Sequence, residues 1–121
     1  MARVLVIEDE VVLRSIIRRV LLGASHDVIE VDTERSGFED ACSVPADVVL
    51  ADICLGERDG IAVMAAIRRA QPGMPLIAVS GRPREEILDR LNAAGLQQSV
   101  WWLAKPFRHE ELLDVVGKAS A

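Results

Sequence analysis

The sequence predicts an α/β fold in which five parallel strands alternate with helices. Short apolar runs recur along the 121 residues, and segments with the spacing of amphipathic helices lie between them. The runs are apolar throughout rather than at alternate positions, which is typical of strands covered on both faces in a parallel sheet. Strands that alternate with helices favour a doubly wound sheet, here (βα)5. The five runs are residues 4–7, 28–31, 48–51, 76–79 and 100–103.

Apolar residues at intervals of three and four predict five helices. The first repeats through Val12, Ile16 and Val20, with Leu13, Ile17 and Leu21 beside them, and stops at Gly23. Thr33 can cap a second helix that runs to about Cys42. The other three carry the apolar stripes Ile61, Met64 and Ile67; Ile87, Leu88 and Leu91; and Leu112, Val115 and Val116.

Composition excludes several classes of function. The length fits one domain with a single core, and the net charge of −5 disfavours binding to nucleic acid or to anionic membranes. Cys42 and Cys54 match no metal or redox spacing, so we expect two reduced thiols. No apolar stretch has the length of a membrane span, and we expect a cytoplasmic protein.

Polar side chains follow four of the five predicted strands at the point where each strand ends. In open parallel sheets, ligands bind outside the carboxyl ends of the strands. We therefore expect these side chains to converge on one edge of the sheet. They are Glu8, Asp9 and Glu10 after the first strand, Asp52 after the third, Ser80 after the fourth and Lys105 after the fifth.

This set of side chains fits phosphoryl transfer. Carboxylates gathered closely either acquire raised pKa values or are neutralised by a cation, and oxygen ligands of this kind suit Mg²⁺. A magnesium ion with free coordination positions receives phosphate oxygens, while a lysine and a hydroxyl supply further contacts. A carboxylate can serve as the nucleophile and form an aspartyl phosphate.

Four motifs stand in order at the strand ends: "VLVIEDE", "VVLADICLGERDG", "IAVSG" and "LAKPF". Together they make the chain similar to the response-regulator receiver domains of two-component signalling. The resemblance covers residues 1–121 as a single receiver domain. It implies a flavodoxin-like strand order 2-1-3-4-5 and a signalling module rather than an enzyme.

The resemblance also implies a role for each matching residue. Asp52 would accept a phosphoryl group from a histidine kinase or a phosphotransfer protein. Asp9 would bind Mg²⁺ directly and Glu8 through water, beside Asp52 itself. Cys54 would give the ion its main-chain carbonyl, so that its thiol is incidental.

Lys105 and Ser80 would each contact a phosphoryl oxygen, and the Lys105–Pro106 peptide bond would be cis. Ser80 would then act with an aromatic residue on the last strand as a switch. That aromatic is Trp102, where tyrosine or phenylalanine is usual. Other departures are Gly56, where proline is common, and a longer connection at residues 95–99, which leaves the downstream target protein unknown.

Alternative functions stay open at this point. A magnesium-dependent phosphatase with an aspartate nucleophile would need a second acid where Cys54 stands. A nucleotide or flavin module would need a phosphate-binding loop in place of Glu8, Asp9 and Glu10. A receiver that signals by binding alone is a further possibility, either as a separate protein or as part of a longer regulator.

Overall fold

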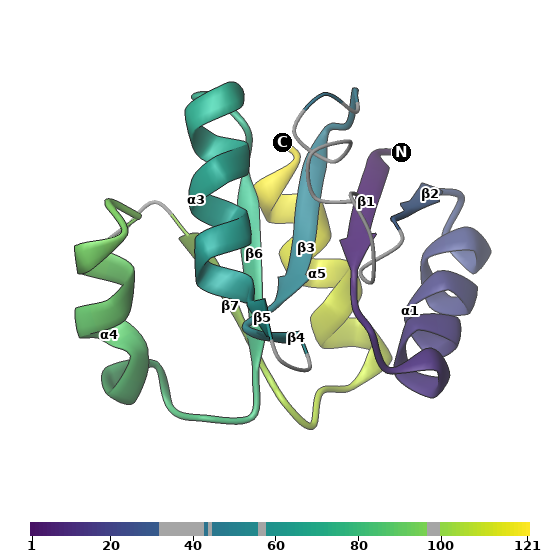
Figure 1. Cartoon of the computed structure of the whole chain (residues 1–121). Helices are drawn as coiled ribbons and strands as arrows, with labels where there is room; N and C mark the ends of the chain where they lie inside the picture. The colour runs from purple at the N-terminus through teal and green to yellow at the C-terminus, as the bar shows by residue number, and fades with distance from the viewer. Residues whose placement is uncertain (32–42, 44, 56–57, 97–99) are drawn as a thin grey trace.

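The computed structural model describes residues 1–31, 43, 45–55, 58–96 and 100–121, and the second predicted helix, from Thr33 to Cys42, lies outside them. A parallel five-stranded sheet with the order β2-β1-β3-β6-β7 forms the centre of the molecule (Figure 1). This order confirms the predicted fold class and topology. The strands are β1 Arg3–Ile7, β2 Asp27–Glu30, β3 Val48–Asp52, β6 Leu76–Ser80 and β7 Val100–Ala104.

The register of the sheet aligns the carboxyl ends of the central strands. Ile7 pairs with Ala51, and Ser80 pairs with Ala104. Asp52, the last residue of β3, lies opposite Val79. Residues that follow these pairs therefore leave the sheet along one edge, as the sequence predicts.

Two helical layers cover the sheet, one on each face (Figure 1). On one face, Val4 and Val6 of β1 pack in a core with α1 Val11–Gly23 and α5 His109–Ala119. On the other face, Leu5 and Ile7 pack in a core with α3 Gly60–Ala70 and α4 Arg84–Ala93. Alternation along β1 thus divides its side chains between two cores.

Of the two adjacent apolar rows that the sequence shows in helix α1, the row with Ile17 and Leu21 faces the sheet. Ile17 and Leu21 are buried, whereas Val12 is 66% exposed and Ile16 is 39% exposed. The helix carries two adjacent apolar rows, and only one of them can contact the sheet. Leu88 of α4 is exposed for the same reason.

A short hairpin that the sequence does not predict follows β3. Its strands are β4 Cys54–Leu55 and β5 Arg58–Asp59, which pair antiparallel. The Asp59 carboxylate then caps α3 by accepting a hydrogen bond from the Ile61 main-chain N–H at 2.9 Å. The hairpin therefore connects the end of β3 directly to the first turn of α3.

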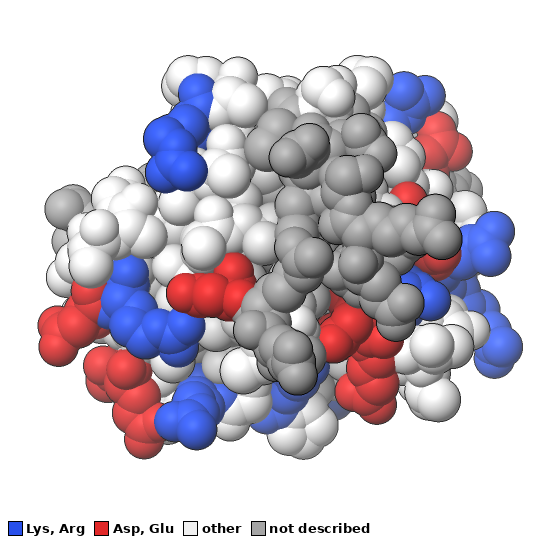
Figure 2. All heavy atoms as spheres, in the orientation of Figure 1, with Lys and Arg blue, Asp and Glu red and all other residues white. Residues whose placement is uncertain are grey.

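Positive and negative side chains are interspersed on the face shown in Figure 2, most visibly around α4, where Arg84, Glu85 and Glu86 follow one another. Within the described parts of the chain, no helix has the length and apolar character needed to cross a membrane.

Candidate functional site

Two acids and one lysine from distant parts of the chain meet at the carboxyl edge of the sheet. Glu8 follows β1, Asp52 ends β3 and Lys105 follows β7. The Lys105 ammonium donates to Asp52 Oδ2 and lies 3.4 Å from Glu8 Oε1. Asp52 is 6% exposed and Glu8 is 3% exposed. The predicted convergence of the first, third and fifth strands thus produces a buried cluster with one cation.

The environment disfavours the charged form of Glu8. Burial, and then the neighbouring charge of Asp52, raise the pKa of Glu8 to about 7, while Lys105 opposes the shift. Partial burial by itself lowers the pKa of Lys105. The hydrogen bond to Asp52 and the charge of Asp52 raise it, and Glu8 contributes in the same two ways, so that the pKa of Lys105 is raised overall. The lysine therefore stays charged between two carboxylates.

The second oxygen of Asp52 is held by the chain that follows it. Asp52 Oδ1 accepts a hydrogen bond from the Cys54 main-chain N–H at 2.8 Å. The thiol of Cys54 is free, and the residue is exposed. Cys54 also pairs with Asp59 in the hairpin, so the orientation of the Asp52 carboxylate depends on the hairpin.

Ser80 ends the neighbouring strand, and its side chain is engaged in a local turn. The hydroxyl accepts a hydrogen bond from the Arg82 main-chain N–H at 2.9 Å and donates to the Arg82 carbonyl at 3.3 Å. Ser80 is buried. Contact with a group bound at Asp52 would require the hydroxyl to exchange these partners.

Oxygen atoms at this edge fit a magnesium ion. Glu8 Oε2 is buried and has no hydrogen-bond partner among the described residues. Asp9, half-buried, and Glu10, exposed, continue the same turn. In the described ranges, no group of three or more acidic, histidine or cysteine residues is placed so that it could hold a metal ion. The donor set instead suits Mg²⁺, which keeps several water ligands and binds through one or two carboxylates.

The two tryptophans of β7 point to opposite faces of the sheet. Trp102 is partly buried against the core that α3 and α4 cover. Trp101 is 42% exposed. The Lys105–Pro106 peptide bond is cis, as the resemblance implies.

Sequence reasoning missed two arginines that contact this region. Arg14 Nη1 of α1 donates to the Glu8 carbonyl at 3.2 Å. Arg90 Nη2 of α4 donates to Asp59 Oδ1 at 2.9 Å. The sequence places Arg14 close to Glu8, six positions further on, but it does not show which atoms are in contact. For Arg90, which is 31 positions from Asp59, the sequence offers no signal.

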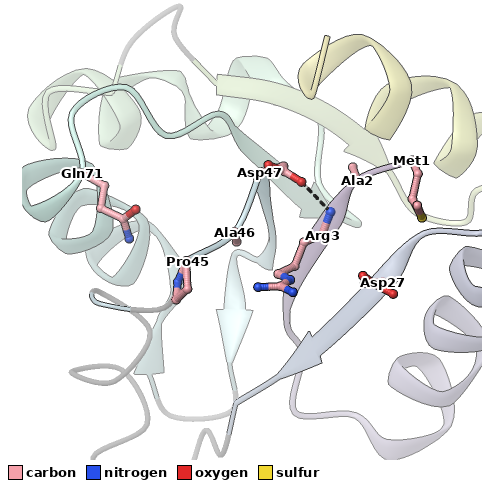
Figure 3. A pocket seen from close by; sticks show the side chains of 8 residues that line it. All are labelled: Met1, Ala2, Arg3, Asp27, Pro45, Ala46, Asp47 and Gln71. Atoms are coloured by element: carbon pink, nitrogen blue, oxygen red, sulfur yellow. Dashed lines mark hydrogen bonds between the residues drawn. The ribbon is translucent and has the colours of Figure 1, made fainter.

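A cavity of about 490 Å³ lies at the opposite edge of the sheet (Figure 3). The Arg3 main-chain N–H donates to Asp47 Oδ2 there at 2.8 Å. This cavity is lined by residues next to the amino ends of β1, β2 and β3, including Asp27 and Pro45. It is separate from the cluster of Glu8, Asp52 and Lys105.

Solved structures confirm the fold. A chemotaxis protein CheY4 of Vibrio cholerae is 24% identical with a TM-score of 0.84, and the alignment covers 98% of each chain. The receiver domain of the sensor histidine kinase PA1611 from Pseudomonas aeruginosa PAO1 is also 24% identical, with a TM-score of 0.82 over 98% of this chain and 97% of that one. That structure is described with a magnesium ion coordinated in its active-site cleft.

Curated relatives include longer regulators. The KDP operon transcriptional regulatory protein KdpE of Escherichia coli K12 is 32% identical over 114 residues, which are 93% of this chain and 48% of KdpE. The response regulator protein FleR of Pseudomonas aeruginosa is 27% identical over 97% of this chain and 24% of FleR. The chain thus spans half or less of these relatives. The model of the response regulator receiver domain family matches residues 4–117, and the chain belongs to that family.

Proposed function

We propose that this domain accepts a phosphoryl group on Asp52 in a magnesium-dependent reaction. One observation carries the proposal: the ammonium of Lys105 lies between the buried carboxylates of Asp52 and Glu8 at the carboxyl edge of the sheet. A cation that balances a nucleophilic carboxylate can also contact the oxygens of an incoming phosphoryl group.

In the proposed step, an oxygen of Asp52 forms a bond to phosphorus while the bond between phosphorus and the donor nitrogen breaks. The donor nitrogen keeps the electron pair of that bond. Lys105 turns from Asp52 to a phosphoryl oxygen. Ser80 gives up its hydrogen bonds with Arg82 and donates to a second phosphoryl oxygen. Mg²⁺ would be held by Glu8, Asp9, Asp52 and the Cys54 carbonyl, and would neutralise phosphoryl charge.

The surface beside Lys105 supports a protein as the donor. A groove of about 500 Å³ runs between α1 and the segment after β7, and much of it is apolar. A histidine kinase or a phosphotransfer protein could cover such a groove while it presents a phosphohistidine to Asp52. The groove is lined by Glu10, Val12, Leu13, Ile16, Lys105, Pro106, Phe107 and His109.

The domain acts, in this proposal, as a signalling module rather than as an enzyme with an external substrate. The phosphoryl group carries about −1.5 to −2 charges, and its bond to Asp52 removes the single negative charge of the carboxylate, so the bound group replaces one negative charge with a larger one. Ser80 and Trp102 would carry the change to a protein-binding surface, since Ser80 lies on the strand beside β7. The downstream partner would be a protein contacted through that surface.

Acetyl phosphate and intact-mass measurement test the proposal. The protein with Mg²⁺ should gain one phosphoryl group, and it should gain none in a chelator. The matched control is Asp52→Asn, which keeps the shape of the side chain and removes the nucleophile. Equal phosphorylation of Asp52→Asn, or none of the wild type, would contradict the proposal. Multiple turnover of a simple phosphate ester would favour a phosphatase instead.

A further inference from the structure

Arg14 connects three elements around the acidic turn that follows β1. Its Nη1 donates to the Glu8 carbonyl at 3.2 Å, and its Nε lies 3.9 Å from Glu30 Oε2. Arg14 belongs to α1, Glu8 follows β1 and Glu30 ends β2. The side chain of Arg14 is 27% exposed, so these contacts are partly shielded from water.

The contact with Glu8 is made to the main chain and not to the carboxylate. It therefore fixes the path of the turn from Glu8 to Glu10, in which three consecutive residues are acidic. Like charges in this turn repel one another and favour a looser path. A planar guanidinium can hold two acceptors at a fixed angle, which a lysine cannot do.

We propose that Arg14 is a positioning residue for magnesium: it fixes the turn so that Glu8 and Asp9 present their carboxylates toward Asp52. The inference rests on the proposed function, since it concerns the ion that the phosphoryl transfer would use. Groups that orient the ligands of a metal commonly change its affinity by about 10–100-fold when they are removed. Arg14 acts through the main chain, so a smaller effect is expected.

A magnesium titration followed by amide NMR tests the role of Arg14. The amide chemical shifts of Glu8, Asp9 and Cys54 in the folded protein report the dissociation constant for Mg²⁺. A variant that is less stable but still folded therefore gives a valid measurement. Arg14→Gln should bind Mg²⁺ about three- to tenfold more weakly than the wild type. Arg14→Lys, which keeps the charge, should lie between the two.

The matched control is Arg18→Gln, because Arg18 is exposed on the same helix and its loss changes the net charge equally. Its magnesium affinity should stay within about twofold of the wild type, as expected for a solvated charge. Equal affinities for Arg14→Gln and Arg18→Gln, or wild-type affinity for Arg14→Lys, would overturn the positioning role. Failure of the wild type to bind Mg²⁺ would overturn the proposed function as well.

Discussion

Gly60 lies against the main-chain carbonyl of Asp52, where a Cβ atom on residue 60 would be 1.9 Å from the carbonyl oxygen. It would also lie 2.7 Å from the carbonyl oxygen of Ile53, to which the Gly60 N–H donates a hydrogen bond. No side chain fits between these atoms without a shift of the main chain. The start of α3 is therefore fixed directly to the strand that carries Asp52.

Gly60→Ala should lower the free energy of unfolding by about 1–3 kcal/mol, as overpacking of a close contact does. Urea unfolding measures the change. Gly117→Ala is the matched control, because a methyl group added to Gly117 in α5 would meet no atom of another described segment within 4 Å. That control should leave stability unchanged or raise it by up to about 1 kcal/mol. Equal stability of the two variants would contradict the steric argument.

The stability of the metal-free protein should fall as the pH rises from about 4.5 to about 7. In this range folded Glu8 keeps a proton that the unfolded chain releases, since its pKa rises from 4.5 to about 7 on folding. Unfolding is therefore linked to proton release, and the loss by pH 7 is on the order of 3 kcal/mol. Urea unfolding in a chelator across this range measures it.

Two substitutions isolate the contribution of Glu8 to the slope of the unfolding free energy against pH. Glu8→Gln stays neutral at every pH and should remove this part of the dependence. Glu10→Gln changes an exposed acid in the same turn and should leave the slope as in the wild type. A slope that is identical in the wild type and in Glu8→Gln would show that Glu8 does not cause it.

Phosphorylation should shift the tryptophan emission to shorter wavelength as Trp102 becomes more deeply buried. Trp101→Phe removes the exposed second fluorophore and leaves Trp102 as the only tryptophan. The measurement combines emission spectra with intact mass after addition of acetyl phosphate and Mg²⁺. The same variant with Asp52→Asn should show no shift. An unchanged spectrum with phosphorylation proven by mass would exclude Trp102 as the switch.

Strands and strand order follow from the sequence because their signals are local and redundant. Each apolar run is long enough to mark a strand, and the alternation with helices restricts how the strands can be connected. The sequence does not show which side of helix α1 faces the sheet, because the row through Val12 and the row through Ile17 are equally apolar. The direction in which the chain leaves β1 decides between them, and periodicity holds no information about that direction.

Some features of the candidate site could likewise be predicted from the sequence, and others could not. The meeting of Glu8, Asp52 and Lys105 follows from parallel topology, which brings the strand ends to one edge. The bond of Ser80 to Arg82 and the reach of Arg14 to the Glu8 carbonyl depend on side-chain conformation, which spacing does not fix. Hairpin β4–β5 has two residues in each strand, too few to show any period.

Lys105 is separated from Asp52 by 53 positions and from Glu8 by 97. During synthesis, the two acids leave the ribosome long before the lysine that balances them. A nascent chain that ends before β7 carries both carboxylates but lacks their cation, and the same holds for a fragment cut before residue 100. Under the proposed function, the competence to receive a phosphoryl group would therefore be acquired only when the last strand is in place.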